Sequence, residues 1–206
     1  MNKGLWVGIT MALAALAGPA QAQNVLLNPG FETSDGGTGA QNWGNWFNPA
    51  AGVTQQRVTT ESHTGIASAN THLTLDIDND LGGWLQDITG WSVGQTVNAS
   101  IWAKTSITGG AYAQMGIEAI GGGGIIWGPS TASGSWTQLT QTLVVPVGTT
   151  QLKLIAFHAN TANSAGDIWF DDASATLSPI PEPSSVALMG MGLVGLLGAV
   201  RRKLRS

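Results

Sequence analysis

Apolar and polar residues alternate in short runs along most of the central part of the chain. In the run at residues 96–105, the odd positions from Val97 to Ala103 are apolar and the even positions are mostly polar. This period of two is typical of a β-strand that turns one face to a core and the other to water. Comparable runs occupy residues 53–60, 71–77, 85–88, 96–105, 113–120, 136–145, 151–158 and 168–177. Short strands at this spacing, with no competing pattern of an amphipathic helix, predict an all-β sandwich or barrel.

Turn residues separate these runs. We interpret residues 121–124 and the segment around Pro129 as breaks between strands, because a glycine-rich phosphate loop would have to lead into a helix and none follows. Residues 33–48 are polar and rich in glycine around Trp43 and Trp46. We expect a long loop there, whose two tryptophans would cap a cleft.

The N-terminus has the pattern of a secretory signal peptide. Lys3 precedes an apolar run at residues 5–17, and the small residues Ala20 and Ala22 stand at the positions that a signal peptidase reads. The apolar run is shorter than the roughly 20 residues of a membrane span. We therefore expect signal peptidase to remove residues 1–22.

The C-terminus carries a second apolar segment with different flanks. Pro181, Glu182 and Pro183 precede an uncharged run at residues 186–200, and Arg201 begins a basic cluster. A helix of this length reaches about 22 Å, less than a hydrocarbon core of about 30 Å, so it is suited to temporary anchoring. The positive-inside rule places the basic end in the cytoplasm and the domain outside.

These three elements, in this order, resemble the PEP-CTERM sorting signal of Gram-negative envelope proteins, here at residues 179–206. The resemblance implies that an exosortase-type enzyme processes the tail. It also implies a destination at the cell surface or in the extracellular matrix, since proteins with this signal accompany exported polysaccharide and biofilm matrix. The membrane is then a partner only through the C-terminal tail.

Residues 23–178 form one domain between the two ends, and its charge is acidic. Three basic residues stand against eleven acidic ones, a net charge of −8, whereas the whole chain carries −4. This charge argues against nucleic acid as a partner. The chain has no Cys, and a domain of about 155 residues buries enough surface to fold without disulfides.

Four short motifs mark the beginning, middle and end of this domain. They are Asn28-Pro29-Gly30-Phe31-Glu32, Gly83-Trp84-Leu85-Gln86, Ser135-Trp136-Thr137 and Ile168-Trp169-Phe170-Asp171-Asp172. In this order they resemble the jelly-roll carbohydrate-binding modules of the xylan and glucan type, within the galactose-binding-like group. The resemblance implies a jelly-roll β-sandwich that binds polysaccharide, either xylan-like or glucan-like or the cell's own exopolysaccharide.

Two acidic residues at opposite ends of the domain are candidates for a metal site. A jelly roll commonly pairs its first and last strands, so Glu32 and Asp171 would meet. Asp171 alternates with Trp169 and other apolar residues, and an unpaired carboxylate on such a face would cost several kcal/mol. A calcium ion would compensate this charge and join the terminal strands.

The resemblance implies the same ion, a structural calcium held by Glu32 and Asp171. It implies that Gly30, Thr64 and Ala67 complete the ligand set, largely through backbone carbonyls. In the alternative interpretation, Asp171 lies at the surface and Glu32 accepts hydrogen bonds from nearby backbone amides.

Sugar binding requires aromatic faces for the C–H groups of a pyranose ring and a few fixed polar groups for its hydroxyls. By the resemblance, Trp84 and Trp127 are stacking aromatics of a concave cleft, and His158 is a polar contact. Gln86 alternates with Trp84 on one strand face and fits the same role. The alternative is that Trp84 and Trp127 belong to the core and that His158 only ends a strand. Three further tryptophans, Trp102, Trp136 and Trp169, are expected to be structural.

The sequence offers no catalytic constellation. The Ser residues lack the context of a nucleophile elbow, the three His residues lack zinc spacing, and Glu118 has no evident partner carboxylate. We therefore expect an exported, non-catalytic polysaccharide-binding protein. The alternative is a structural matrix scaffold that binds no sugar.

Overall fold

The alternating residues form the strands that their pattern predicts. The computed structural model describes residues 22–47, 53–74, 82–159 and 164–178. Its ten strands are β1 (Gly44–Phe47), β2 (Val53–Val58), β3 (Ser68–Leu73), β4 (Gly82–Asp87), β5 (Thr96–Thr108), β6 (Tyr112–Ile120), β7 (Gly124–Thr131), β8 (Thr137–Val144), β9 (Gln151–Ala159) and β10 (Ala165–Leu177). In β5, Val97 to Ala103 are buried at odd positions, as expected for the inward face of a sheet.

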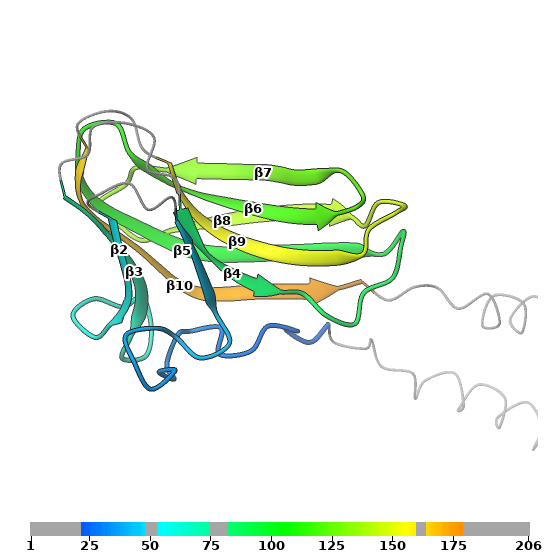
Figure 1. The fold of residues 1–206 in the computed structure, drawn as a ribbon, viewed down its shortest axis with the longest axis horizontal. Helices are drawn as coiled ribbons and strands as arrows, with labels where there is room; N and C mark the ends of the chain where they lie inside the picture. Colours follow the sequence, from blue (N-terminus) through cyan, green and yellow to red (C-terminus); the bar gives the residue numbers. More distant parts are fainter. Residues whose placement is uncertain (1–21, 48–52, 75–81, 160–163, 179–206) are drawn as a thin grey trace, which may run out of the picture.

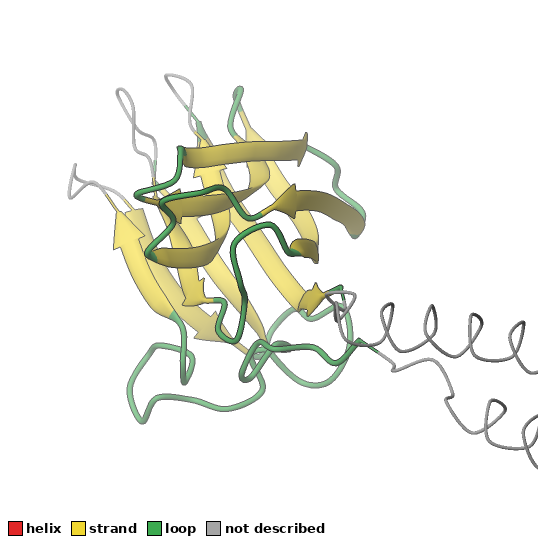
Figure 2. Ribbon diagram, turned by 90° about the vertical axis from the view of Figure 1, so that its right-hand side faces the viewer, coloured by secondary structure: helices red, strands yellow, loops and turns green. Residues whose placement is uncertain are grey.

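The strands form two five-stranded antiparallel sheets that pack face to face (Figures 1 and 2). The first sheet has the order β1-β4-β9-β6-β7, and the second sheet has the order β2-β3-β10-β5-β8. Consecutive strands often lie in different sheets, so the chain crosses repeatedly between the layers. The arrangement is a jelly-roll β-sandwich, and the predicted fold class is confirmed.

The core between the two sheets is apolar and filled by large side chains. The fully buried ones include Phe31, Trp84, Ile101, Leu154 and Phe170. Burial of each such side chain contributes about 1.5–3 kcal/mol, which is consistent with a domain that has no disulfide. The inward faces of both sheets are therefore occupied by packing, and any ligand of either sheet must bind on an outward face.

The N-terminal segment lies along the last strand. Asn24 forms a β-bridge with Thr176, its Nδ2 donates to the Ala173 carbonyl (3.1 Å), and the Ala175 amide donates to its Oδ1 (2.9 Å). The predicted meeting of the two ends of the domain is confirmed. A turn follows in which the Phe31 amide donates to the Asn28 carbonyl (3.1 Å), and this turn directs the Phe31 ring into the core.

Two strands were missed by the sequence pattern, β1 and β7. β1 lies inside the expected long loop, and β7 begins in the expected glycine-rich break and contains Pro129. Both are the edge strands of the first sheet. An edge strand tolerates proline and glycine because one side of its backbone has no partner to satisfy, so its sequence carries a weaker strand signal.

The alternation of β10 is interrupted by a bulge. The register with β5 shifts between Asp171 and Ser174, and Asp172 has a positive φ of 45°. As a result Phe170, Ala173 and Ala175 all face the core. The prediction that Trp169 and Ala173 share one face is therefore wrong, because a bulge inserts an extra residue into the period of two.

The two predicted sorting segments, residues 1–22 and 179–206, fall outside the described residues except for Ala22. Within the described ranges, no helix is long and apolar enough to cross a membrane.

Candidate functional site

Three of the four predicted sugar contacts are buried side chains. The Trp84 side chain is 1% exposed and packs edge-on against Phe31, with ring centroids 6.2 Å apart. His158 is completely buried and shares the inward-facing parity of Leu152 and Leu154 on β9. The prediction of a cleft lined by Trp84 and His158 is corrected by this burial: both face the core, and neither presents a surface to a sugar.

Gln86 is also buried, and it has a structural partner. Its Oε1 accepts from the Leu27 amide (2.7 Å), while its Nε2 donates to the carbonyls of Leu27 (2.7 Å) and Asn42 (3.0 Å). These bonds satisfy the side chain completely enough that no donor remains for a ligand. Gln86 therefore fastens the N-terminal segment to β4. It also contributes to the lining of a hollow on that side of the domain, described below, so its role as a sugar contact stays a prediction.

Trp127, the fourth predicted contact, lies on the outward face of the first sheet. Its side chain is 43% exposed. A Cβ atom added at Gly116 would lie 3.0 Å from the Trp127 ring, so the indole rests directly on the backbone of β6. The absence of a side chain at Gly116 thus sets the height and orientation of the ring.

Two more aromatic side chains continue this surface. The Trp127 and Phe157 ring centroids are 4.6 Å apart, and Phe157 is stacked with Trp46 at 6.3 Å and an interplanar angle of 21°. Trp46 is 45% exposed. We call Trp46, Phe157 and Trp127 the aromatic row; it runs across the first sheet from β1 through β9 to β7.

The sequence reasoning missed Phe157 and assigned Trp46 to a loop. A signal for Phe157 existed, because Phe157 shares the parity of Lys153, a charged residue that marks the outward face of β9. Trp43, which was expected beside Trp46 on the same loop, is instead buried in the core, where its Nε1 donates to the Asn28 carbonyl (3.0 Å).

A hollow adjoins the aromatic row on the same side of the domain. It has a volume of about 350 Å³ and is lined by Leu85, Asn42, Asp87 and Lys153, among others. Leu85 also packs against Phe157 and its neighbours on the outward face, so the hollow and the row form one continuous surface.

Three charged side chains lie on the strands of the first sheet near this surface. Asp87, Lys153 and Glu118 are cross-strand neighbours on β4, β9 and β6, and Lys153 Nζ lies 3.8 Å from Asp87 Oδ1. They place charged donors and acceptors on the same outward face as the aromatic row. This combination suits the recognition of hydroxyl groups around a sugar ring.

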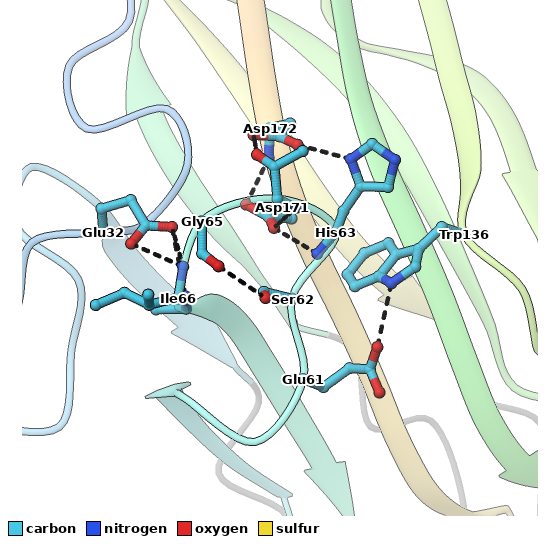
Figure 3. A network of polar contacts seen from close by, with 11 residues as sticks. Glu32, Glu61, Ser62, His63, Gly65, Ile66, Trp136, Asp171 and Asp172 are labelled. Carbon is cyan, nitrogen blue, oxygen red and sulfur yellow. Dashed lines mark hydrogen bonds and ion pairs between the residues drawn. The ribbon is translucent and has the colours of Figure 1, made fainter.

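Two of the predicted calcium ligands, Glu32 and Asp171, lie at a different place, where the N-terminal segment meets β10 (Figure 3). The Glu32 carboxylate accepts from the amides of Ile66 (3.0 Å) and Ala67 (3.4 Å). Asp171 Oδ2 accepts from the amides of His63 (2.7 Å) and Thr64 (3.2 Å). We call this arrangement of two carboxylates and one loop the terminal junction.

Asp171 is completely buried, so the alternative interpretation of Asp171 as a surface residue is wrong. Burial raises its pKa from 3.8 to about 6, against the opposing effect of the amide hydrogen bonds from His63 and Asp172. The negative charge of the neighbouring Asp172 raises the pKa further. Removal from water therefore outweighs the amide hydrogen bonds at this carboxyl.

The terminal junction has a donor set that fits a hard cation in part. Gly30 lies among three carboxylates, since a Cβ at this position would be 3.5 Å from Asp172 Oδ1, 3.8 Å from Asp171 Oδ1 and 3.6 Å from Glu32 Cγ. Among the described residues, no group of three or more His, Cys, Asp or Glu side chains is arranged to hold a metal ion. The predicted set contains only two carboxylates, and backbone carbonyls would supply the remaining ligands.

Comparison with known proteins supports the sorting signal and the fold. The PEP-CTERM protein-sorting motif matches residues 179–203, so the chain carries this signal, which indicates export with a membrane-anchored tail. No curated protein matches the sequence.

Several solved structures share the fold at low identity. One is the TmCBM61 module in complex with beta-1,4-galactotriose (TM-score 0.54, 17% identity, covering 76% of this chain and 100% of that chain). Another is the CBM22-1 xylan-binding domain from Paenibacillus barcinonensis Xyn10C (TM-score 0.56, 16% identity, covering 77% and 97%). A cyclase from Fischerella sp. TAU is similar as well (TM-score 0.59, 14% identity, covering 77% and 98%). The chain therefore has the jelly-roll fold of carbohydrate-binding modules, and that fold alone does not determine its activity.

Proposed function

We propose that this chain is an exported, non-catalytic protein that binds extracellular polysaccharide on the outward face of its first sheet. The observation that carries the proposal is the aromatic row. Two tryptophans, Trp46 and Trp127, are each more than 40% exposed on a sheet face, and both are held in place by Phe157. Rigid exposed aromatic rings bind ligands with little loss of conformational entropy.

The surroundings of the row support a sugar rather than a purely apolar ligand. A pyranose has C–H groups on the faces of its ring and hydroxyls around its edge, so it matches an aromatic floor flanked by charged side chains. Asp87 and Lys153 provide such side chains in the adjoining hollow. One similar structure is a complex with beta-1,4-galactotriose and another is a xylan-binding domain, so β-linked neutral polysaccharides are the first to test.

The experiment is affinity electrophoresis of the full-length exported protein in a zwitterionic detergent that contains no sugar. Gels would contain xylan, β-glucan, β-1,4-galactan or the cell's own exopolysaccharide. We expect retardation by at least one of them. Trp127→Ala should weaken binding roughly 30-fold, equivalent to about 2 kcal/mol.

Val147→Ala is the matched control, because Val147 is apolar and 85% exposed but lies in the turn between β8 and β9 rather than on the aromatic row. It should bind as the parent does. Absence of retardation on every polysaccharide would refute sugar binding and favour the matrix scaffold.

The non-catalytic part of the proposal has its own test. A glycosidase needs two suitably spaced carboxyl groups, one of them protonated at working pH by a raised pKa. Glu118 lies on the outward face of the first sheet, whereas Asp171, whose pKa is raised by burial, belongs to the second sheet. Prolonged incubation with each bound polysaccharide should release no reducing ends, and measurable release would show that the protein is an enzyme.

We also propose that calcium binds at the terminal junction, through Glu32, Asp171 and backbone carbonyls of Gly30, Thr64 and Ala67. The buried negative charge of Asp171 supports this, since a divalent cation compensates such a charge. Thermal unfolding in calcium and in chelator should differ by several degrees, because a ligand at a hundredfold excess over its Kd stabilises the folded state by about 2.7 kcal/mol. Identical melting curves would exclude the ion.

The sorting tail completes the proposal. An exosortase-type enzyme would process the segment at residues 179–203, where the sorting motif matches, and release the domain to the cell surface or the matrix. Replacement of Pro181, Glu182 and Pro183 by alanine should leave an unprocessed, membrane-bound chain of higher mass. Normal processing of that variant would show that the motif is not used.

A further inference from the structure

The outward face of the second sheet carries a hollow of its own. Its volume is about 580 Å³, and its lining includes Trp169, Lys104, Glu61, Ser106 and Thr108. The hollow lies on the opposite side of the sandwich from the aromatic row, because each sheet turns its other face to the common core. We propose that this hollow is a second saccharide-binding site, which would take a neutral pyranose unit; the proposal rests on the polysaccharide-binding function proposed above.

Trp169 supplies the aromatic floor of the hollow. It lies on β10 directly opposite Lys104 on β5, and its side chain is partly exposed. Its neighbours on either side along the strand, Ile168 and Phe170, are fully buried. Trp169 therefore projects outward from a rigid strand in the middle of the second sheet, since β10 is its central strand.

The polar groups around Trp169 hold one another in fixed positions. Lys104 Nζ lies 5.6 Å from the Trp169 ring centroid and 2.9 Å from Glu61 Oε2. The other Glu61 oxygen, Oε1, accepts from Trp136 Nε1 at 3.2 Å (Figure 3). This chain of contacts leaves little side-chain freedom to lose when a ligand binds.

The Trp136 ring, which donates to Glu61, is itself held by a further aromatic contact. The His63 ring is stacked on Trp102, with ring centroids 4.0 Å apart and an interplanar angle of 15°, and it meets Trp136 edge-on at 5.6 Å. The His63 ring therefore contacts both Trp102 and Trp136, and we assign these two tryptophans a structural role beside the hollow. Of the three tryptophans expected to be structural, Trp169 lines this hollow.

The charges of the hollow indicate which class of saccharide fits. The positive charge of Lys104 is paired with Glu61, so the hollow offers a neutral ion pair rather than a free cation. The whole domain is acidic, with a net charge of −8 at residues 23–178. Acidic saccharides would be repelled, whereas a neutral sugar ring can stack on Trp169 and exchange hydrogen bonds with the ion pair and with Ser106 and Thr108.

Two sites on opposite faces would let one molecule hold two polysaccharide strands. Binding of both faces to one network raises the overall avidity far above the affinity of either site. A monovalent protein would coat a polysaccharide, whereas this one would cross-link it.

The test uses calorimetry and the indole N–H signals of ¹⁵N-tryptophan-labelled, full-length exported protein, titrated with xylohexaose, cellohexaose, β-1,4-galactotriose and a trigalacturonate. The four proteins are the parent, Trp127→Ala, Trp169→Ala and the double variant. We expect two ligands per parent molecule, one per single variant and none for the double variant. The Trp169 indole signal should still shift in Trp127→Ala.

Trp169→Phe guards against a folding defect, since it keeps an aromatic floor. It should bind at the second site within roughly tenfold of the parent, whereas Trp169→Ala should lose that site while its melting temperature shows that it is folded. Cross-linking is measured separately as precipitation of the long polysaccharide, which both single variants should lose.

The outcomes separate the two proposals. If the parent binds one ligand, Trp127→Ala abolishes this binding and the Trp169 signal does not shift, then the second site is overturned and the first is kept. Binding lost only in Trp169→Ala would keep the second site and overturn the aromatic row. No binding by any saccharide would overturn both, and binding of trigalacturonate alone at Trp169 would overturn the neutral class of ligand.

Discussion

The buried carboxyl of Asp171 should make the stability of the domain depend on pH in an unusual direction. Burial raises its pKa from 3.8 to about 6, so the folded state binds this proton more tightly than the unfolded state does. Between these two pH values the folded protein holds more protons, and its stability therefore falls as the pH rises. Most paired surface carboxylates have the opposite effect, because their pKa is lower in the folded state.

The magnitude follows from the size of the shift. A rise of roughly two units, at 1.36 kcal/mol for each, means that full ionisation of Asp171 costs the folded state about 3 kcal/mol. About 2.5 kcal/mol of this cost develops between pH 4 and pH 7, because the carboxyl of the unfolded chain is already partly ionised at pH 4. Asp171→Asn cannot ionise and keeps the shape of the side chain. It exchanges one acceptor oxygen for an N–H donor near the amides of His63 and Thr64. This exchange changes the free energy of unfolding of the variant by the same amount at every pH.

The assay is urea unfolding of the parent and Asp171→Asn at intervals from pH 4 to pH 7 in chelator. The parent should lose about 2.5 kcal/mol relative to the variant over this range, as other titrating groups cancel in the comparison. A constant difference, or a parent that gains relative to the variant, would refute the reasoning. With calcium present the trend should reverse if the ion binds, because calcium requires the ionised carboxylate.

Two further predictions concern packing. Gly65 has a φ of +65°, and a methyl group there would overlap the Glu32 carboxylate, whereas a methyl group at Gly36, with a φ of +94°, would meet nothing within 4 Å. Backbone strain of about 1 kcal/mol is common to both positions. Gly65→Ala should therefore lower the melting temperature more than Gly36→Ala. Trp84→Ala should destabilise the domain by about 3–5 kcal/mol through loss of core packing. Trp84→Phe should destabilise it by much less and leave sugar binding in gels unchanged. Loss of binding by a well-folded Trp84→Phe variant would show that Trp84 belongs to the binding site.

The period of two was enough to predict the sandwich, because the interior strands of both sheets alternate regularly. It did not reveal β1 and β7, whose edge positions relax the demands on their sequence. It also put Trp169 and Ala173 on one face, because the bulge after Asp171 shifts the alternation and the sequence of this strand contains no signal for a bulge.

The predicted sugar contacts show a different limit. Resemblance put Trp84 in a cleft, although Asp87 on the same strand already marked the other parity of β4 as the outward face. The same argument from Lys153 would have identified Phe157 on β9. Charged residues inside a strand thus indicate the outward face more reliably than aromatic residues do, because aromatic side chains are stable on either face.

The pairing of Asn24 with β10 has a consequence for the order of events during export. The Ala175 amide and Asn24 Oδ1, which are hydrogen-bonded, are 151 residues apart in the sequence. β10 is also the central strand of the second sheet. The second sheet thus cannot close until the last strand before the sorting motif has emerged. A chain delivered N-terminus first would remain without its tertiary structure until nearly all of it had crossed, and completion of the fold would coincide with arrival of the tail at the membrane.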